Sequence, residues 1–159
     1  MKIQIICVGK LKEKYLKDGV LEYSKRLSRF CSFEVIELND EKIPQNPSLA
    51  ECNKVIEAEG EQILKKINKD SYIIALCVEG KSLTSEEFAQ KFSKITLAGK
   101  SSITFIIGGS LGLSESIKKL SDFKLSFSSF TFPHQLMRLI LTEQIYRAFK
   151  INSNEEYHK

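Results

Sequence analysis

The chain has 159 residues, of which 42% are hydrophobic. This length and composition suffice for one core, so we expect a single domain spanning residues 1–159. The opening residues lack the cleavage site of a secretory leader, and no run approaches the roughly 18 apolar residues that a membrane span needs. We therefore expect a soluble protein that does not associate with membranes.

The four cysteines, Cys7, Cys31, Cys52 and Cys77, form no CxxC pair, and neither histidine lies at metal-ligand spacing from them. Cys7 and Cys77 fall within apolar patterns, where cysteine usually behaves as a small buried hydrophobe. We expect no metal site. A reducing, cytoplasmic compartment fits this cysteine usage best.

The net charge of +4 is distributed unevenly along the chain. Residues 1–30 carry eight Lys/Arg against three Asp/Glu, residues 31–61 carry two against eight, and the remainder carries fourteen against nine. Such clustering can mark a phosphate-bearing partner. A solvated helix face explains the lysines between residues 10 and 17 equally well, so the charge alone leaves both interpretations open.

Alternating strand and helix patterns run along the chain. Strands are expected at residues 2–9, 33–38, 72–78, 103–108 and 123–128, and helices at 15–30, 49–67, 86–99 and onward from Pro133. Ser48 with Glu51, and Thr84 with Glu87, form capping boxes at two helix starts. The first, third and fourth strands are almost uniformly apolar, which is typical of strands buried on both faces of a parallel sheet. The sequence predicts an α/β sandwich, a mostly parallel sheet flanked by helices.

Three glycines follow the fourth strand in FIIGGSLGLSESI, residues 105–117, before a further helix opens. Ligands collect outside the carboxyl ends of parallel strands, and the ends VEGKS, GGSLG and SSFT could converge on one pocket. Gly108, Gly109 and Gly112 depart from the GxGxxG fingerprint, and the chain contains no GxxxxGK[ST] motif. They do not indicate a phosphate cradle. A tight turn with positive φ would explain them without any ligand.

The last helix has apolar residues around much of its circumference, which predicts burial. A dimer interface and packing against the chain's own sheet explain this pattern equally well. Glu143 and Arg147 are four residues apart, in the order that favours an ion pair worth about 0.2–0.5 kcal/mol. His134 and Arg138 share a face of this helix, and a structural histidine beside an exposed arginine is the simplest interpretation of that pair.

Several motifs taken together resemble one family. LCVEGK (76–81), FIIGGSLGL (105–113), LSFSSFTFPHQLMRLILTEQIYRAF (125–149) and the terminal YHK resemble the RlmH family, SPOUT-class methyltransferases of bacterial large-subunit ribosomal RNA. The resemblance covers essentially the whole chain, and TFPHQLMR followed by EQIYRAF is its specific part. It implies S-adenosylmethionine as methyl donor, a homodimer, and methylation of N3 of pseudouridine 1915 in 23S rRNA on the assembled ribosome. It also implies a deep C-terminal trefoil knot, which ordinary connection rules would not predict.

The same resemblance assigns roles to individual residues. It implies cofactor binding by Leu76, Gly108, Phe127, Ser128, Ser129, Phe130, Thr131 and Phe132. Arg147, Tyr157 and His158 are implied in catalysis, with the tail of one subunit folding over the other's cofactor. His158 is the best candidate base for the N3 proton, because imidazole titrates near neutrality. Candidate substrate contacts are His134, Arg138, Lys12, Lys17 and Arg26; a frayed terminus is the simpler interpretation of the tail.

Two alternatives come from other functional classes. A nucleotide-binding oxidoreductase or hydrolase would require a glycine fingerprint after the first strand, where VGKLKEK offers a single glycine. A non-enzymatic ribosome-associated module would use the glycine loop only as a turn. Binding of S-adenosylmethionine separates these interpretations, because only the methyltransferase requires it.

Overall fold

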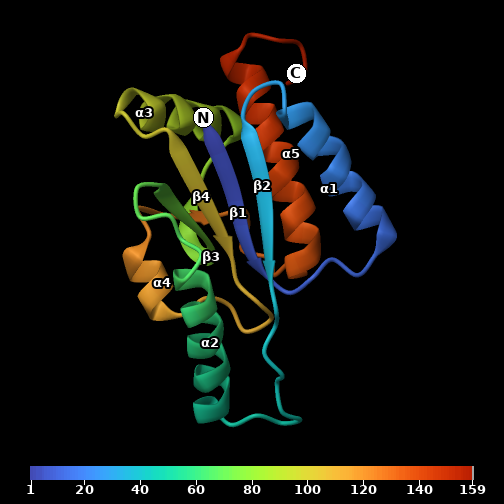
Figure 1. Cartoon of the computed structure of the whole chain (residues 1–159), viewed down its shortest axis with the longest axis vertical. Coiled ribbons are helices and arrows are strands. Elements are labelled where there is room, and N and C mark those ends of the chain that lie inside the picture. The colour runs from blue at the N-terminus through green and yellow to red at the C-terminus, as the bar shows by residue number, and fades with distance from the viewer. Residues whose placement is uncertain (159) are drawn as a thin grey trace.

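Five parallel strands form the centre of the protein, in the order β2-β1-β4-β3-β5 (Figure 1). The structure is a computed structural model that describes residues 1–158, so Lys159 of the terminal YHK lies outside the described residues. The elements are β1 (Lys2–Val8), α1 (Lys14–Leu27), β2 (Ser32–Leu38), α2 (Leu49–Leu64), β3 (Tyr72–Ser82), α3 (Ser85–Leu97), β4 (Ser102–Ile107), α4 (Glu115–Leu120), β5 (Phe123–Ser126) and α5 (His134–Asn152). The predicted α/β sandwich with a parallel sheet is confirmed.

Helices cover both faces of the sheet. Successive side chains of each strand point to opposite sides, so apolar strands place hydrophobic side chains on both faces. On β1, Ile3 and Ile5 face the layer formed by α1, α3 and α5, whereas Ile6 and Val8 face α2 and α4. The central strand β4 and its neighbour β1 are buried almost throughout, as their apolar sequences predict. Two hydrophobic cores therefore hold the sheet between the helical layers.

The long helix α5 crosses the sheet between α1 and α3 (Figure 1). Leu141 and Ile145 are fully buried against the sheet, which confirms packing within the chain's own core. Other apolar residues of the same helix, Leu136, Met137, Leu139 and Ile140, are only partly buried. The broad apolar circumference thus divides into a buried stripe and a half-covered row. Among residues 1–158, no helix is long and apolar enough to cross a bilayer.

Irregular pairing between β3 and β5 shapes the sheet edge. Leu76 and Lys81 both align with Leu125 of β5, so the four residues between them leave the ladder. A bulge of this kind bends its strand and redirects side chains away from the sheet. Residues 77–79 of this irregular segment line the cavity described below. Sequence alone predicted a strand ending at residue 78 and gave no sign of the bulge.

Candidate functional site

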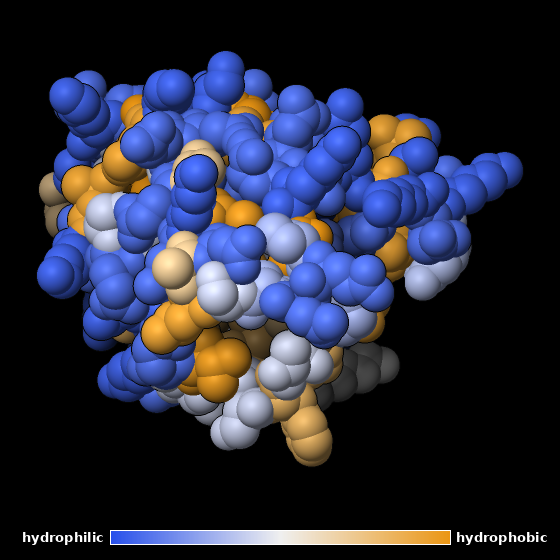
Figure 2. Space-filling view, turned by 90° about the horizontal axis from the view of Figure 1, so that it is seen from below, coloured by the Kyte–Doolittle hydropathy of each residue, from blue (hydrophilic) through white to orange (hydrophobic). Residues whose placement is uncertain are grey.

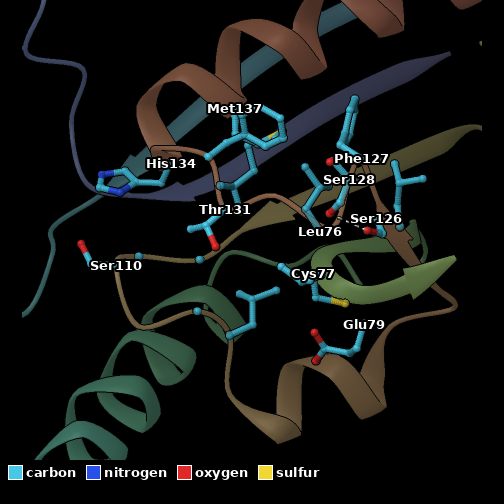
Figure 3. A pocket seen from close by; sticks show the side chains of 18 of the residues that line it. Leu76, Cys77, Glu79, Ser110, Ser126, Phe127, Ser128, Thr131, His134 and Met137 are labelled. Carbon is cyan, nitrogen blue, oxygen red and sulfur yellow. Dashed lines mark hydrogen bonds between the residues drawn. The ribbon is translucent and has the colours of Figure 1, made fainter. Parts of the chain in front are cut away.

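A cavity of about 730 Å³ opens at the carboxyl ends of the strands. Its walls come from three chain segments: the β3 bulge (76–79), the glycine loop (107–113) and the stretch from β5 into α5 (125–137). Figure 3 shows side chains of all three segments surrounding the same space. The predicted convergence of the three strand ends on one pocket is confirmed. Figure 2, which views the molecule from below, shows a hollow bordered by apolar and weakly polar side chains within a mostly hydrophilic surface.

The cavity walls combine apolar and polar side chains. Leu76, Leu113, Phe127 and Met137 contribute side chains to the lining. The 126–130 turn uses its own hydroxyls for hydrogen bonds: Ser126 Oγ donates to the Ser128 carbonyl at 3.2 Å, and Phe130 N–H donates to Ser128 Oγ at 3.1 Å. Phe130 itself is 78% exposed at the rim.

The glycine loop both makes a tight turn and lines the cavity. Gly112 N–H donates to the Gly109 carbonyl at 3.1 Å, and the φ of Gly112 is +88°. A Cβ at Gly108 would lie 2.6 Å from the Gly112 carbonyl oxygen, so the two strands of the turn can approach only without a side chain. The turn expected from sequence is therefore confirmed, and it also forms one wall of the cavity.

Few charged groups face the cavity. Lys118 of α4 pairs with Glu79 of the bulge at 2.5 Å and with Glu115 at 3.1 Å, and Lys118 is only 19% exposed. Hydrogen bonding to Glu79 raises the pKa of Lys118, and the same contact lowers the pKa of Glu79, so both remain charged. Burial, followed by the nearby Arg138 charge, lowers the pKa of His134. At neutral pH the cavity thus presents one compensated ion pair and a neutral imidazole.

The sequence-based cofactor residues gather here with one exception. Of the eight, only Ser129 lies outside the lining; Leu76, Gly108, Phe127, Ser128, Phe130, Thr131 and Phe132 all contribute to it. His134 also lines the cavity, at the start of α5. Sequence reasoning missed Cys77, Lys118 and Met137 as lining residues, whereas Glu79 belongs to the VEGKS end that was expected to reach the pocket. Cys77 lies within the predicted strand, and a residue that continues a regular strand would not be expected to turn into a pocket.

Arg138 occupies a position that the sequence did not predict. We expected an exposed arginine or a substrate contact, but its side chain is 0% exposed. Its guanidinium donates from Nη1 to Glu37 Oε1 at 2.5 Å and from Nη2 to the Gly9 carbonyl at 3.0 Å. The expectation of exposure is wrong, and in this arrangement Arg138 has no surface to offer a substrate. It joins the ends of β1 and β2 to the first turns of α5.

The basic candidates for RNA contact lie outside the cavity. Lys12, Lys17 and Arg26 are exposed, on the β1–α1 connection and on α1. Arg26 pairs with Glu22 at 2.8 Å on the helix surface. The backbone N–H of Lys12 donates to Gln135 Oε1 at 2.8 Å, which holds this connection beside the start of α5. The structure thus brings Lys12 near the cavity end of α5 but does not join Lys17 or Arg26 to the site.

A second polar cluster lies toward the other end of α5. Glu143 Oε1 accepts from Arg147 Nη2 at 2.6 Å and from the Tyr157 hydroxyl at 3.0 Å, and the Arg147 guanidinium lies over the Tyr157 ring at 4.8 Å. Burial and hydrogen bonds with Tyr23 and Glu143 raise the pKa of Tyr157. The predicted Glu143–Arg147 pair is confirmed. A frayed end is the wrong description of residues 157 and 158, which pack against the chain.

The cavity and this C-terminal cluster are separated along α5. His134 begins the helix and Arg147 lies thirteen residues later, about 20 Å along the axis at 1.5 Å per residue. The three sequence-based catalytic residues, Arg147, Tyr157 and His158, therefore come together with one another but not with the cavity of the same chain. Within residues 1–158, no group of three or more His, Cys, Asp or Glu residues could hold a metal ion.

Comparison with known proteins agrees with this architecture. The profile of a family described as "Predicted SPOUT methyltransferase" matches residues 1–158. The chain is 60% identical to the ribosomal RNA large subunit methyltransferase H of Streptococcus uberis and 56% identical to that of Clostridioides difficile, over all 159 residues and the full length of both. The crystal structure of a tRNA (m1G37) methyltransferase from Aquifex aeolicus aligns with a TM-score of 0.50 over 92% of this chain and 70% of that one, at 15% identity. The chain belongs to the SPOUT methyltransferases and, within them, to the RlmH family.

Proposed function

We propose that the protein is an S-adenosylmethionine-dependent methyltransferase that acts on N3 of a pseudouridine in large-subunit ribosomal RNA, on the assembled ribosome. The observation that carries this proposal is the cavity built from three strand ends, in a chain that is 60% identical over its full length to a ribosomal RNA large subunit methyltransferase H. Its residues also give the cofactor a suitable chemical environment.

The cavity fits an adenosine joined to a methionine. Its volume of about 730 Å³ lies within the range of small-molecule sites. Leu76, Phe127 and Phe132 provide apolar contacts for the faces of a purine, and the main chain at 107–112 and 126–131 offers amide and carbonyl groups for its edge. When bound, S-adenosylmethionine supplies a methyl group on an already activated sulfonium. The protein's task is then mainly to align that group with its acceptor.

The acceptor side requires the C-terminal cluster. Methylation of N3 releases a proton, and His158 is the residue best placed by chemical type to accept it. Tyr157 can stack on or orient the target base, and Arg147 can contact its polar edge or a neighbouring phosphate. Since the cluster lies about 20 Å along α5 from the cavity of its own chain, these roles need a second subunit.

A two-fold dimer provides that subunit. In an isologous interface the same patch of both chains meets itself, so an axis crossing the middle of α5 would set the C-terminal cluster of one chain beside the partner's cavity. The half-covered apolar row of α5, Leu136, Met137, Leu139 and Ile140, is the surface that such an axis would bury. The homodimer is part of this proposal. The trefoil knot stays a prediction from the resemblance.

The exposed cations of the β1–α1 region complete the proposed substrate site. Lys12, Lys17 and Arg26 are free of the cavity and lie on the surface, where they can contact ribosomal RNA phosphates. His134, at the cavity, is the remaining candidate for contact with the target nucleotide. With a compact fold and no separate RNA-binding unit in residues 1–158, specificity would come from surfaces of the assembled ribosome.

Transfer of a labelled methyl group tests the proposal. Ribosomes from a strain lacking the endogenous enzyme should accept the label on N3 of one pseudouridine, and free rRNA should accept far less. Deleting residues 157–159 should abolish transfer while leaving calorimetric affinity for S-adenosylmethionine largely intact. Donor binding without any transfer would favour a different RNA substrate, and absence of donor binding would favour the non-enzymatic ribosome-associated module.

A further inference from the structure

His158 is held between two charged groups of opposite sign. Its Nε2 lies 2.7 Å from Glu86 Oε1, and its Nδ1 lies 3.2 Å from Arg147 Nη1. Glu86 belongs to α3, 72 residues away in sequence, and was not among the residues implicated by the sequence. The imidazole is thus fixed by two elements other than the tail that carries it.

These two contacts favour one placement of the proton on the ring. A guanidinium has only donors, so Nδ1 facing Arg147 must accept and must be unprotonated. A carboxylate has only acceptors, so Nε2 facing Glu86 must carry the hydrogen. The two contacts together fit the Nε2–H tautomer of His158, with the lone pair on Nδ1.

Glu86 is a charged hydrogen-bond acceptor at the start of α3. It lies in the first turn of α3, whose start is fixed by the reciprocal hydrogen bonds of Thr84 and Glu87. Carboxylates are favoured at a helix N-terminus by the exposed N–H groups there. The hydrogen bond from His158 is the largest of the contacts that lower the pKa of Glu86, to about 2, so the side chain stays ionised. A permanently charged acceptor on a well-defined helix start therefore faces the C-terminal tail.

We propose that Glu86 is a positioning residue for His158, holding the proton on Nε2 so that Nδ1 is the atom that accepts the N3 proton. This inference rests on the proposed function and adds a residue to it. As the bond from the methyl carbon to N3 forms and the donor sulfur keeps the electron pair, the N3 proton passes to Nδ1. The resulting imidazolium remains paired with the Glu86 carboxylate through Nε2–H.

Arg147 completes the arrangement, because its guanidinium donates to Nδ1 in this structure. It must leave Nδ1 before that atom can accept a proton, and an RNA phosphate or base carbonyl offers the guanidinium a stronger acceptor. Arg147 therefore covers the base until substrate arrives. Its other partner, Glu143, keeps it within reach.

Nitrogen-15 NMR tests the tautomer on the protein alone. The chain has only two histidines, so a His134→Gln variant assigns the His158 ring signals unambiguously. We expect the Nε2–H tautomer in wild type and in Glu86→Gln, whose amide oxygen still accepts from Nε2–H, and a mixture of tautomers in Glu86→Ala. Glu34→Ala is the matched control, since Glu34 is also about half exposed and ion-paired, to Lys2. It should leave the His158 signals unchanged.

Steady-state kinetics supply the second readout. Glu86→Ala should lower kcat about tenfold or more, as loss of a carboxylate that orients a functional histidine does elsewhere, without changing the KM for the donor. Glu86→Gln should restore most of kcat. An Nδ1–H tautomer in wild type, or an unchanged tautomer and kcat in Glu86→Ala, would overturn the proposal. If wild type transfers no methyl group, the proposed function fails, while the NMR comparison still decides whether Glu86 sets the tautomer.

Discussion

The guanidinium of Arg138 is buried beside the carboxylate of Glu37, with Nη1 2.5 Å from Oε1. Glu37 Oε1 also accepts from the backbone N–H of Leu11 at 3.0 Å, and Arg138 Nη2 donates to the Gly9 carbonyl. Two loops after parallel strands are thereby attached to the helix that begins at the cavity. Arg138 Nε has no hydrogen-bond partner among the described residues, so the pair carries a desolvation cost that these attachments must offset.

Replacing Arg138 should destabilise the fold strongly. In Arg138→Met, Glu37 and the Gly9 carbonyl lose their partner, and breaking such a buried pair costs about 3 kcal/mol. Urea unfolding measures the change. Arg26→Met is the control, because an exposed, solvent-screened pair such as Arg26–Glu22 should contribute far less to stability. An equal loss of stability in the two variants would contradict the role of Arg138 in attaching the ends of β1 and β2 to α5.

Two glycines with the same backbone conformation allow a matched test of the glycine loop. Gly112 (φ +88°) and Gly99 (φ +83°) both have positive φ, and an added Cβ would meet no atom within 4 Å at either. Alanine should therefore cost about 1 kcal/mol of stability at each position, from backbone strain alone. Only Gly112 lines the cavity, so only Gly112→Ala should weaken donor binding, up to about fivefold by calorimetry. An equal effect of Gly99→Ala on affinity would argue against the cavity as the donor site.

The buried carboxyl group of Glu59 should make the stability of the fold depend on pH. It is 4% exposed beneath the glycine loop, and Oε2 has no partner among the described residues. Burial, and to a lesser extent the charges of Glu41 and Asp40, raise its pKa. The folded state therefore keeps this proton over a pH range in which the unfolded state has lost it. Stability should rise as the pH falls through that range and decline as the pH rises through it.

Glu59→Gln should consequently be more stable than wild type at pH 7, and the difference should shrink toward about pH 5. The glutamine oxygen can still accept the Glu41 N–H, which donates to Glu59 Oε1 at 3.1 Å in wild type. Urea unfolding across this range measures the difference, with the exposed Glu57→Gln on the same helix as control for the loss of one charge. If wild type is more stable than Glu59→Gln at pH 7, the raised pKa of Glu59 is contradicted.

Salt should weaken binding to the ribosome steeply if the basic α1 region contacts RNA phosphates. Replacing Lys12 or Lys17 with Gln should lower affinity and reduce the slope of log affinity against log salt by up to about one for each phosphate that is no longer neutralised. Filter binding at several salt concentrations measures both quantities. Lys54→Gln, on exposed α2 surface, should change neither. A flat salt response in wild type would mean that shape or protein contacts dominate binding.

Much of the fold follows from local sequence pattern. The apolar runs of β1 and β4 and the capping boxes at Ser48 and Thr84 specify buried parallel strands and well-defined helix starts, and the structure has them where the pattern predicts. The convergence of three strand ends also follows, because parallel strands finish at one edge of a sheet. The pocket could thus be located before its walls were known.

What could not be predicted depends on contacts distant in sequence. The bulge that brings Cys77 into the cavity wall arises from how β3 pairs with β5, and the burial of Arg138 arises from Glu37, 101 residues earlier in the chain. Likewise, Glu86 gains its significance only from His158, 72 residues later. Periodicity reports which residues share a face, but not which side chains from separate elements meet there.

Mixed dimers test the central claim, that a cavity on one chain and the C-terminal cluster of another form a single site. One variant carries Thr131→Trp, which fills the cavity from an exposed lining position, and the other carries Tyr157→Ala with His158→Ala. Each should be inactive alone. Unfolding and re-forming dimers from an equal mixture should restore about a quarter of wild-type methyl transfer, because half of the dimers then contain one complete site. Mixtures that form heterodimers yet remain inactive would contradict the account.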